Sequence, residues 1–314
     1  MGRWVRVRAY CSSANLGPGF DMLAIALNAY YDEVVVKVED EVEGVVVEHV
    51  RGPYASEVIA RRNTAVEAVS RLLEDIGVSV GVSLSIYKGI PVGRGLGSSG
   101  ATAAAAVIGV SRLLGLKLSA SKLVGYAGQG EKVSAGSPHY DNVAASLMGG
   151  LVVVSSDARG ELRVISVPFK GYFALVTPMN PVPEGKTGVM RKVLPSHIAL
   201  EEAVRNFSRA AAMIAAAVKG DLELFGVLMS SDEVVEPKRA PYVPCYEEVR
   251  KAAFEAGALG FALSGAGPTM IALASGPKVA NEVAVAMRDA CECCQDPLAK
   301  VAEPAPGAEV IENG

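Results

Sequence analysis

The sequence contains no uninterrupted apolar run long enough to span a bilayer, and Arg112 interrupts the best candidate. The first ten residues, MGRWVRVRAY, alternate charged and apolar side chains, which is typical of a β-strand and not of a signal peptide. We therefore expect neither membrane insertion nor secretion. The simplest prediction is a cytoplasmic protein without a membrane partner.

An excess of positive charge is also missing. The 314 residues carry a formal net charge of −4 and the pI is about 5.6, which gives no indication of nucleic-acid binding. Half of the residues are hydrophobic and 20% are charged, as in well-packed soluble proteins. The length suits one large domain or two domains of ordinary size.

Cysteine is sparse and forms no complete zinc motif. Besides Cys11 and Cys245, the chain has a C-x-C-C pattern at residues 291–294, and no second half completes a metal site. The prediction is ordinary thiols near a C-terminal helix. Scarce glutamine and abundant valine give a weak indication of a thermophile, in which an intracellular disulfide is permissible.

Residues 91–102, PVGRGLGSSGAT, are rich in glycine but lack the Gly-Lys-Ser/Thr ending of a Walker A loop. They lie between a strand-like run at 80–88 and a helix of small residues at 101–114. Glycine allows tight turns, and a helix N-terminus presents N–H groups and partial positive charge, so the segment can form an anion cradle. Ser98 or Ser99 can cap the helix while the other hydroxyl reaches a metal or phosphate. The alternative is a plain glycine-rich turn with a serine cap.

This segment resembles the phosphate loop of the GHMP kinases, whose usual form is P-x-x-x-G-L-G-S-S-A. CSSANLGPGFD at 11–21, PHYDNVAASLMGG at 138–150 and LSGAGPT at 263–269 match the same family in the expected order. SSANLGPGFD and HYDNVA resemble its homoserine kinase branch in particular. The phosphate loop departs from the family pattern at Gly100, where alanine is usual, and we expect this small change to be tolerated.

The mixture of strands and helices without strict alternation is typical of an α+β protein. The resemblance implies a two-domain GHMP kinase fold, with an N-terminal nucleotide-binding α/β domain (1–168), a C-terminal ferredoxin-like domain (169–314) and the active site between them. The pattern also predicts a hairpin of strands 31–38 and 44–50, a helix over 56–76 ended by Gly77, a loop over 180–195 that carries Lys186, Thr187, Arg191 and Lys192, and a frayed tail, EPAPGAEVIENG.

Phosphoryl transfer from ATP requires a phosphate cradle and neutralisation of charge. The resemblance implies ATP and Mg²⁺ as cofactors, and it places the metal between Ser99 and Glu131; without it, Glu131 would be predicted to be a solvated helix carboxylate. Asn63 matches an adenine-contacting residue, although it equally suits a helix start. The predicted ATP site comprises Pro91, Val92, Gly93, Arg94, Gly95, Leu96, Gly97, Ser98, Ser99, Gly100, Ala101 and Asn63.

Asp141 and Asn142 form the pair expected to face the acceptor hydroxyl. The resemblance leaves open whether Asp141 acts as a base or Asn142 only positions the hydroxyl, and Asp141 also suits a helix cap. His139 is a further candidate base or a support for the loop. A substrate carboxylate is gripped best by arginine and an ammonium by a carboxylate. The predicted substrate site comprises Asn15, Asp21, Asn142, Arg191, Arg239, Ser264, Gly265 and Gly267.

The expected activity is therefore ATP-dependent phosphorylation of the L-homoserine hydroxyl to O-phospho-L-homoserine, a step of threonine biosynthesis. The alternatives are another GHMP small-molecule kinase, such as mevalonate kinase, and a non-catalytic sensor with the same fold. Ser99, Glu131 and the Asp141–Asn142 pair argue against the sensor. A homodimer is expected from the habit of the family.

Overall fold

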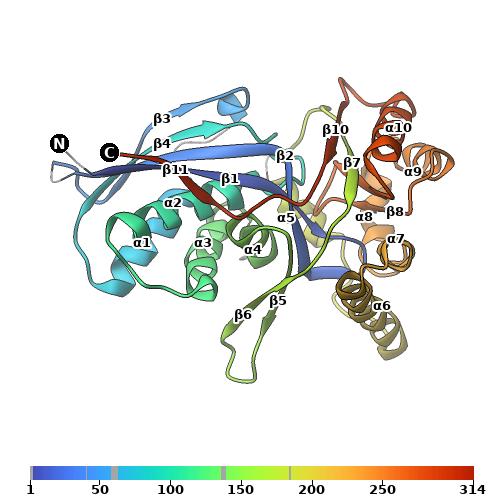
Figure 1. Ribbon diagram of the computed structural model, residues 1–314, viewed down its shortest axis with the longest axis horizontal. Helices are drawn as coiled ribbons and strands as arrows, with labels where there is room; N and C mark the ends of the chain where they lie inside the picture. Colours follow the sequence, from blue (N-terminus) through green and yellow to red (C-terminus); the bar gives the residue numbers. More distant parts are fainter. Residues whose placement is uncertain (1–2, 40, 58–62, 136–138, 184) are drawn as a thin grey trace.

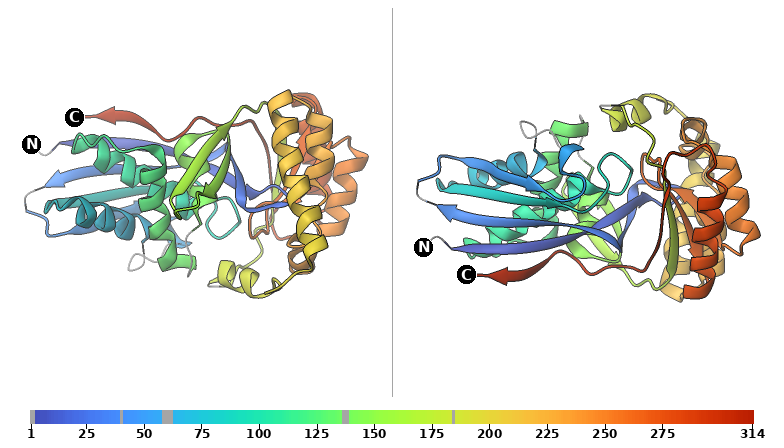
Figure 2. Two further views of the ribbon diagram at one scale, coloured as in Figure 1. Left: turned by 90° about the horizontal axis from the view of Figure 1, so that it is seen from below. Right: turned by 90° about the horizontal axis from the view of Figure 1, so that it is seen from above.

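The computed structural model describes residues 3–39, 41–57, 63–135, 139–183 and 185–314 (Figure 1). The chain forms two sheets, each covered by helices, which lie at opposite ends of the molecule (Figure 2). The larger sheet has the order β11-β1-β2-β4-β3, and β5 and β6 continue from β2. Its strands are β1 (Trp4–Asn15), β2 (Gly19–Glu39), β3 (Val45–Arg51), β4 (Gly81–Lys88), β5 (Leu151–Ser156), β6 (Leu162–Val167) and β11 (Glu309–Asn313).

One face of this sheet is buried, because β1 alternates buried residues such as Val5 and Val7 with half-buried ones such as Arg6 and Arg8. Helix α2 packs on that face. Its sequence is dominated by alanine, so its backbone lies close to β1 and β2, and a Cβ at Gly109 would come 2.5 Å from Val36. The helices of this domain are α1 (Thr64–Ile76), α2 (Ser98–Leu113), α3 (Ala120–Ala135) and α4 (Tyr140–Met148).

The second sheet is antiparallel with the order β10-β7-β9-β8, which is the order of a ferredoxin-like βαββαβ unit. Its strands are β7 (Tyr172–Thr177), β8 (Gly260–Leu263), β9 (Met270–Ala274) and β10 (Leu298–Ala302). Its helices are α5 (Lys186–Lys192), α6 (Leu200–Lys219), α7 (Leu222–Met229), α8 (Glu236–Arg239), α9 (Tyr246–Glu255) and α10 (Pro277–Asp289), with a short 3₁₀ turn at Ala240–Tyr242. A second 3₁₀ turn, Ala55–Glu57, lies between β3 and α1 in the N-terminal domain.

Both faces of this sheet are covered, and the alternation of side chains explains why β7 is apolar throughout. Phe173 and Leu175 point into the core shared with α6 and α7, whereas Ala174 and Val176 point into a second core against α9 and α10. A strand buried on both faces requires apolar residues at every position. The two-domain α+β fold predicted from the sequence is confirmed.

Three local predictions are wrong. Strand β3 does not form a hairpin with β2: β4 lies between them and pairs with β3 in parallel. The tail is not frayed, because β11 pairs with β1 and the bridge Leu27–Pro304 fastens the segment before it. Part of the expected loop over 180–195 is helix α5.

The helix predicted over 56–76 begins later, at Thr64, and residues 58–62 lie outside the described part. Gly77 ends it as predicted, in the left-handed conformation with φ of 66°. In the part of the chain that the structure describes, no helix has the length and apolar character needed to cross a membrane.

Candidate active site

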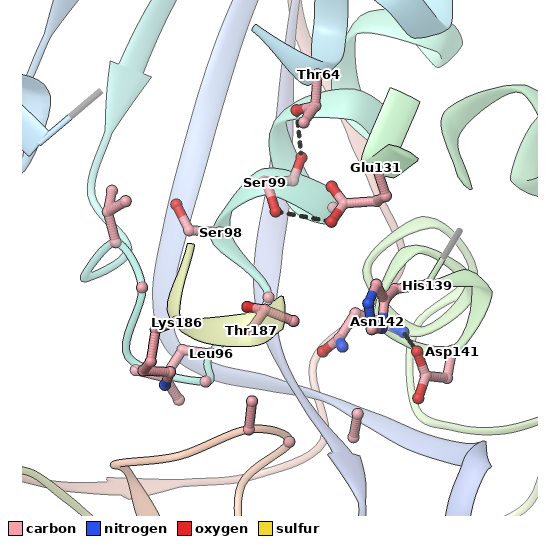
Figure 3. Close-up of a pocket in the computed structure, with 18 of the residues that line it drawn as sticks. Thr64, Leu96, Ser98, Ser99, Glu131, His139, Asp141, Asn142, Lys186 and Thr187 are labelled. Atoms are coloured by element: carbon pink, nitrogen blue, oxygen red, sulfur yellow. Dashed lines mark hydrogen bonds between the residues drawn. The ribbon is translucent and has the colours of Figure 1, made fainter. Parts of the chain in front are cut away.

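A cavity of about 630 Å³ lies where the two domains meet. The N-terminal domain contributes the loop before α2 and the facing ends of α3 and α4. The C-terminal domain contributes residues near α5, Arg239 and the turn between β8 and β9. Figure 3 shows side chains from these separate segments converging on one space. The cavity therefore depends on both domains.

The glycine-rich loop crosses the cavity and leads into α2. Gly97 precedes the helix with φ of 67°, and it has no side chain to cap the first turn. A Cβ at Gly97 would come 2.1 Å from Ser12 Oγ and 2.9 Å from Asn142 Oδ1, so only glycine fits. Ser98, Ser99 and Gly100 line the cavity at the start of the helix. This geometry is that of an anion cradle.

A buried ion pair lies beneath the loop. Lys88 at the end of β4 donates a hydrogen bond to the Asp32 carboxylate, and also to Thr102 at 2.7 Å. The backbone N–H groups of Gly89 and Ile90 donate to Asp32 Oδ1 at 2.9 and 3.0 Å. The pair thus joins β2, β4 and the start of α2.

The two loop serines have different partners. Ser98 donates a hydrogen bond to buried Asp32 at 3.2 Å. Ser99 instead donates to Glu131 of α3 at 2.9 Å, and its carbonyl accepts a hydrogen bond from Thr64 (Figure 3). Ser99 and Glu131 are therefore in direct contact at the N-terminal end of α2. Ser98 instead stabilises the loop through Asp32.

Burial governs the carboxylates of the cavity. Loss of solvent raises the pKa of Glu131 to about 7, although the Ser99 hydrogen bond and the charge of Lys88 oppose the shift. Burial also raises the pKa of Asp141 to about 7, and the nearby charge of Asp21 adds to this. Both groups therefore titrate near neutrality, where a cation or a transferred proton can change their charge.

The N-terminal end of α4 presents the predicted pair to the cavity. Asn142 Oδ1 accepts a hydrogen bond from Ser12 at 2.9 Å, which leaves the amide nitrogen directed to the cavity. Asp141 accepts from the Asn142 N–H at 2.8 Å. Next to them, His139 Nε2 is buried and makes no hydrogen bond within the described residues, and burial lowers its pKa. Figure 3 shows His139, Asp141 and Asn142 side by side.

At the other end of the cavity, charged side chains from both domains surround Phe20. Asp21 forms an ion pair with Arg191 of α5. The guanidinium groups of Arg191 and Arg239 lie 5.5 and 5.3 Å from the centre of the Phe20 ring. Asn15 fixes this corner, since its Oδ1 accepts from the Asp21 N–H at 3.3 Å. Asp21 and Arg239 thus line one end of the cavity, and Arg191 reaches this end through its ion pair with Asp21.

The turn SGAGPT packs against the phosphate loop. Ser264 Oγ donates to the carbonyl of Gly95 at 2.7 Å, and a Cβ at Gly95 would come 2.3 Å from the Ser264 carbonyl. The carbonyl of Gly265 accepts hydrogen bonds from Asn15 and from buried Arg239. The carbonyl of Gly267 accepts one from Lys186. The turn therefore couples the two domains at the cavity floor.

Most of the predicted site residues line this cavity, and six do not. The described residues outside the cavity lining are Pro91, Arg94 and Ala101 of the predicted ATP site and Arg191, Ser264 and Gly267 of the predicted substrate site. Arg94 instead points its side chain at the carbonyls of Pro178 and Asn180 in the C-terminal domain. The role of Arg94 in the ATP site stays a prediction, and its side chain contacts the C-terminal domain instead of the cavity. Asn63 lines the cavity and also caps α1, because its side chain accepts from the Ala65 N–H.

Several lining residues were absent from the predicted site. Burial lowers the pKa of Lys186 to about 7, with smaller contributions from the charges of Arg94 and Arg239. Its only signal in the sequence was membership of a polar segment. Lys88 gave no signal, because a lysine at the end of a strand is normally solvated. His139, which also lines the cavity, was predicted only to be a candidate base or loop support. The other lining residues outside the predicted site are Ala14, Phe20, Thr64, Lys88, Thr102, Val182, Pro183, Gly185, Lys186, Thr187 and Ala266.

Comparison with known proteins agrees with this arrangement. The model of the GHMP kinase N-terminal domain matches residues 63–150, and that of the GHMP kinase C-terminal domain matches residues 213–293. The homoserine kinase of Aeropyrum pernix is 61% identical over 98% of both chains. The homoserine kinase of Thermoplasma volcanium is 42% identical over 83% of this chain and 81% of its own.

Solved structures give the same result. The homoserine kinase of Cytophaga hutchinsonii superimposes with a TM-score of 0.87 and 32% identity over 98% of this chain and 97% of its own. The mevalonate kinase of L. major, with a TM-score of 0.69 and 18% identity over 95% of both chains, shares the fold. The chain belongs to the GHMP kinase family, which makes it an ATP-dependent small-molecule kinase. Its relatives at high identity within that family are homoserine kinases.

The raised pKa of Glu131 predicts a pH dependence of stability. Between about pH 4.5 and 7 the unfolded chain has already released this proton while the folded protein retains it, so the free energy of unfolding falls as the pH rises. Glu131→Gln removes this loss. Between pH 5 and pH 8, we expect the free energy of unfolding of the variant to rise by about 1–3 kcal/mol relative to that of the unsubstituted protein. Urea unfolding in EDTA measures it. The two proteins should be similar at pH 5, and parallel curves up to pH 8 would contradict the burial of this charge.

Proposed function

We propose that the protein is a homoserine kinase, which transfers the γ-phosphoryl group of ATP to the hydroxyl of L-homoserine and yields O-phospho-L-homoserine for threonine biosynthesis. The observation that carries the proposal is the arrangement of the cavity between the two domains. An anion cradle lies beside Ser99 and Glu131, and an acid with two arginines lies at the other end. Identity of 61% to a homoserine kinase supports this acceptor over mevalonate.

The charged end of the cavity matches the two charges of an amino acid. The planar guanidinium groups of Arg191 and Arg239 suit a carboxylate, which arginine binds with two parallel hydrogen bonds. Asp21, held by Asn15, suits the ammonium group. In the structure Asp21 forms an ion pair with Arg191. The ammonium and carboxylate groups of homoserine would bind between these two side chains, whose charges already complement each other. The turn residues Ser264, Gly265 and Gly267 close this side of the site.

The other end suits the nucleotide. Backbone N–H groups of residues 92–100 and the start of α2 would hold the phosphates, and Asn63 would lie near the base. Ser99 and Glu131 offer two hard oxygen ligands, which is the kind and number of protein ligand that Mg²⁺ uses beside phosphate and water. A buried carboxylate with a raised pKa also fits a site built for a cation. The ion would neutralise charge on the transferring phosphoryl group.

The residues of α4 would handle the acceptor hydroxyl. The hydrogen bond from Ser12 uses the amide oxygen of Asn142, so the amide nitrogen can hold the hydroxyl in line with the phosphate. Asp141 lies next to Asn142 and has a pKa of about 7, so it can take up the hydroxyl proton near neutral pH. Positioning and charge neutralisation supply most of the rate enhancement in such a transfer. The proposal includes a domain boundary at residue 168, between the two domains that form the site. It also places the enzyme in the cytoplasm, where ATP is available. No nucleic-acid partner is proposed.

We also infer a homodimer that pairs through α6. Leu200, Val204, Phe207 and Val218 are exposed and repeat at helical spacing along one side of this helix. Glu201 and Glu202 lie at its beginning and Lys219 at its end. Two such helices packed antiparallel about a twofold axis would bury both stripes and bring opposite charges together. The closed contact is self-complementary, as a dimer requires.

The acceptor assignment is tested with a panel of alcohols. We expect efficient phosphorylation of L-homoserine and little of mevalonate, which lacks an ammonium group. Asp21→Asn keeps the shape of the side chain but removes its charge, so kcat/KM for homoserine should fall about 30-fold or more, with ATP binding unchanged. Coupled ADP release measures both. Equal use of mevalonate by the unsubstituted enzyme would exclude the homoserine assignment, and an unchanged kcat/KM in Asp21→Asn would exclude the ammonium contact.

The metal assignment separates the two serines of the loop. Glu131→Gln should lower kcat about 10²- to 10³-fold, the usual scale for losing one electrostatic stabiliser. Ser99→Ala should raise the Mg²⁺ concentration required for half-maximal activity. Ser98→Ala is the matched control, because its hydroxyl contacts Asp32 below the loop; it should lower thermal stability but keep the Mg²⁺ response. The measurement is activity as a function of Mg²⁺ concentration. If both alanine variants require the same Mg²⁺ concentration for half-maximal activity, the proposed metal site is contradicted.

The dimer is tested by charge substitution on α6. Phe207→Asp should convert the protein to a monomer, because it places a carboxylate in the middle of the proposed apolar contact. Ile165→Asp on β6 is the control: Phe207 is 58% exposed and Ile165 is 56% exposed, but Ile165 lies outside the stripe. Light scattering after size-exclusion chromatography gives the mass. A monomeric unsubstituted protein, or a dimer that survives Phe207→Asp, would rule out this interface.

A further inference from the structure

Four of the five cysteines meet at one edge of the C-terminal domain. Cys245, just before α9, is joined to Cys293, and Cys291 is joined to Cys294 in the segment after α10. The Cα–Cα distances are 5.9 and 5.2 Å, which is normal for disulfides. The prediction of ordinary thiols in this region is therefore wrong. Cys11 is buried and unpaired, far from this group in the sequence.

The two disulfides differ in what they constrain. Cys291–Cys294 spans 3 residues and closes one turn of the same segment. Cys245–Cys293 spans 48 residues and fastens the segment 291–295 to the start of α9. A cross-link between distant positions removes more conformational freedom than a local one. The position of residues 293–295 thus depends mainly on the Cys245–Cys293 bond.

Residues 293–295 are in turn hydrogen-bonded to residues 179 and 180. The N–H of Met179 donates to the carbonyl of Gln295 at 2.8 Å, and the N–H of Gln295 donates to Asn180 Oδ1 at 2.9 Å. Asn180 Nδ2 donates to the carbonyl of Cys293 at 3.4 Å. Asn180 is therefore held on both sides of its amide group by the segment that carries Cys293.

This segment ends at the phosphate loop. The buried Arg94 side chain leaves the cavity and donates to the carbonyls of Pro178, at 3.3 Å, and Asn180. The carbonyl of Arg94 itself accepts from the N–H of Thr269 at 3.1 Å. A continuous set of contacts thus runs from the Cys245–Cys293 disulfide through Asn180 to the loop that cradles phosphate.

We propose that the Cys245–Cys293 disulfide sets the affinity for ATP by holding Asn180, and through it Arg94, in position. Asn180 and Arg94 are positioning residues, since neither lines the cavity. In the dithiol form the segment 293–295 is no longer fastened to α9, and the carbonyls that hold Arg94 lose their support. The phosphate loop then samples more conformations, and ATP binding must order it.

The redox step uses a low-molecular-weight disulfide as oxidant. One protein thiolate attacks it, forms a mixed disulfide and releases one small thiol; the second protein thiolate then displaces the other small thiol and forms Cys245–Cys293. Two electrons and two protons pass to the small disulfide. Cys293 is exposed and Cys245 is half-buried, so an oxidant of this size can reach the pair.

The experiment compares full-length protein equilibrated in oxidised and in reduced dithiothreitol. Alkylation and peptide mass spectrometry give the thiol state, and calorimetry with a non-hydrolysable ATP analogue gives an affinity that does not depend on the acceptor. We expect reduction to weaken binding of the analogue about 3- to 10-fold, the scale of one or two lost hydrogen bonds, and to lower Tm by about 5–10 °C. The kcat at saturating ATP should change less than twofold.

Three variants separate the coupling from simple stabilisation. Cys245→Ser should bind the analogue weakly in both conditions. The double variant Cys291→Ser, Cys294→Ser should keep the full redox response, because it retains the long-range cross-link. Asn180→Ala should keep the disulfide and the redox dependence of Tm, but its affinity for the analogue should no longer depend on redox state.

Three results would overturn the proposal. The first is an affinity for the analogue that does not change when Cys245–Cys293 is shown to be reduced. The second is a normal redox response of affinity in Asn180→Ala. The third concerns the sulfur atoms of Cys245, Cys293 and Cys294, which lie within 4.8 Å of one another: release of stoichiometric zinc on alkylation of the isolated protein would show a metal thiolate site in place of the disulfides.

Discussion

The buried ion pair between Asp32 and Lys88 is the constraint on which the active site depends. Asp32 receives hydrogen bonds from Lys88, from Ser98 and from two backbone N–H groups at the end of β4. The pair therefore fixes the beginning and the end of the phosphate loop relative to β2. Removing one partner of a buried pair typically destabilises a protein by about 3–5 kcal/mol, because a charge is left without compensation. The pair thus maintains the shape of the loop while Ser99 remains available to the cavity.

A second constraint closes the site from the other domain. The turn between β8 and β9 contacts the phosphate loop so closely that Gly95 cannot be replaced by a residue with a side chain. Arg239 and Lys186 reach the same turn and donate to its carbonyls. Both side chains line the cavity and are held in place by these backbone oxygens. In the proposed function, this preorganisation would favour binding of an anionic group.

The sequence predicted the fold class and the main site segments, because each depends on local patterns. The glycine-rich loop, the SGAGPT turn and the Asp141–Asn142 pair lie around one cavity as expected. Strand partners were less predictable: the alternation in residues 44–50 shows a strand, but it does not specify parallel pairing with β4. The buried roles of Asp32 and Lys88 depend on contacts across 56 residues of sequence, which no local pattern encodes. The roles of individual site residues stay predictions.

The pairing of β11 with β1 has a consequence for how the chain is made. Val5 of β1 lies opposite Asn313 of β11, so β1 can pair with β2 early but meets β11 only after the second sheet has been translated. At typical translation rates this delay is roughly 15–60 s. During that time one edge of the N-terminal sheet is uncovered, and unpaired strand edges attract other chains. Newly made N-terminal domains are therefore exposed to edge-to-edge association until β11 has been synthesised, and β11 then covers this edge of the sheet.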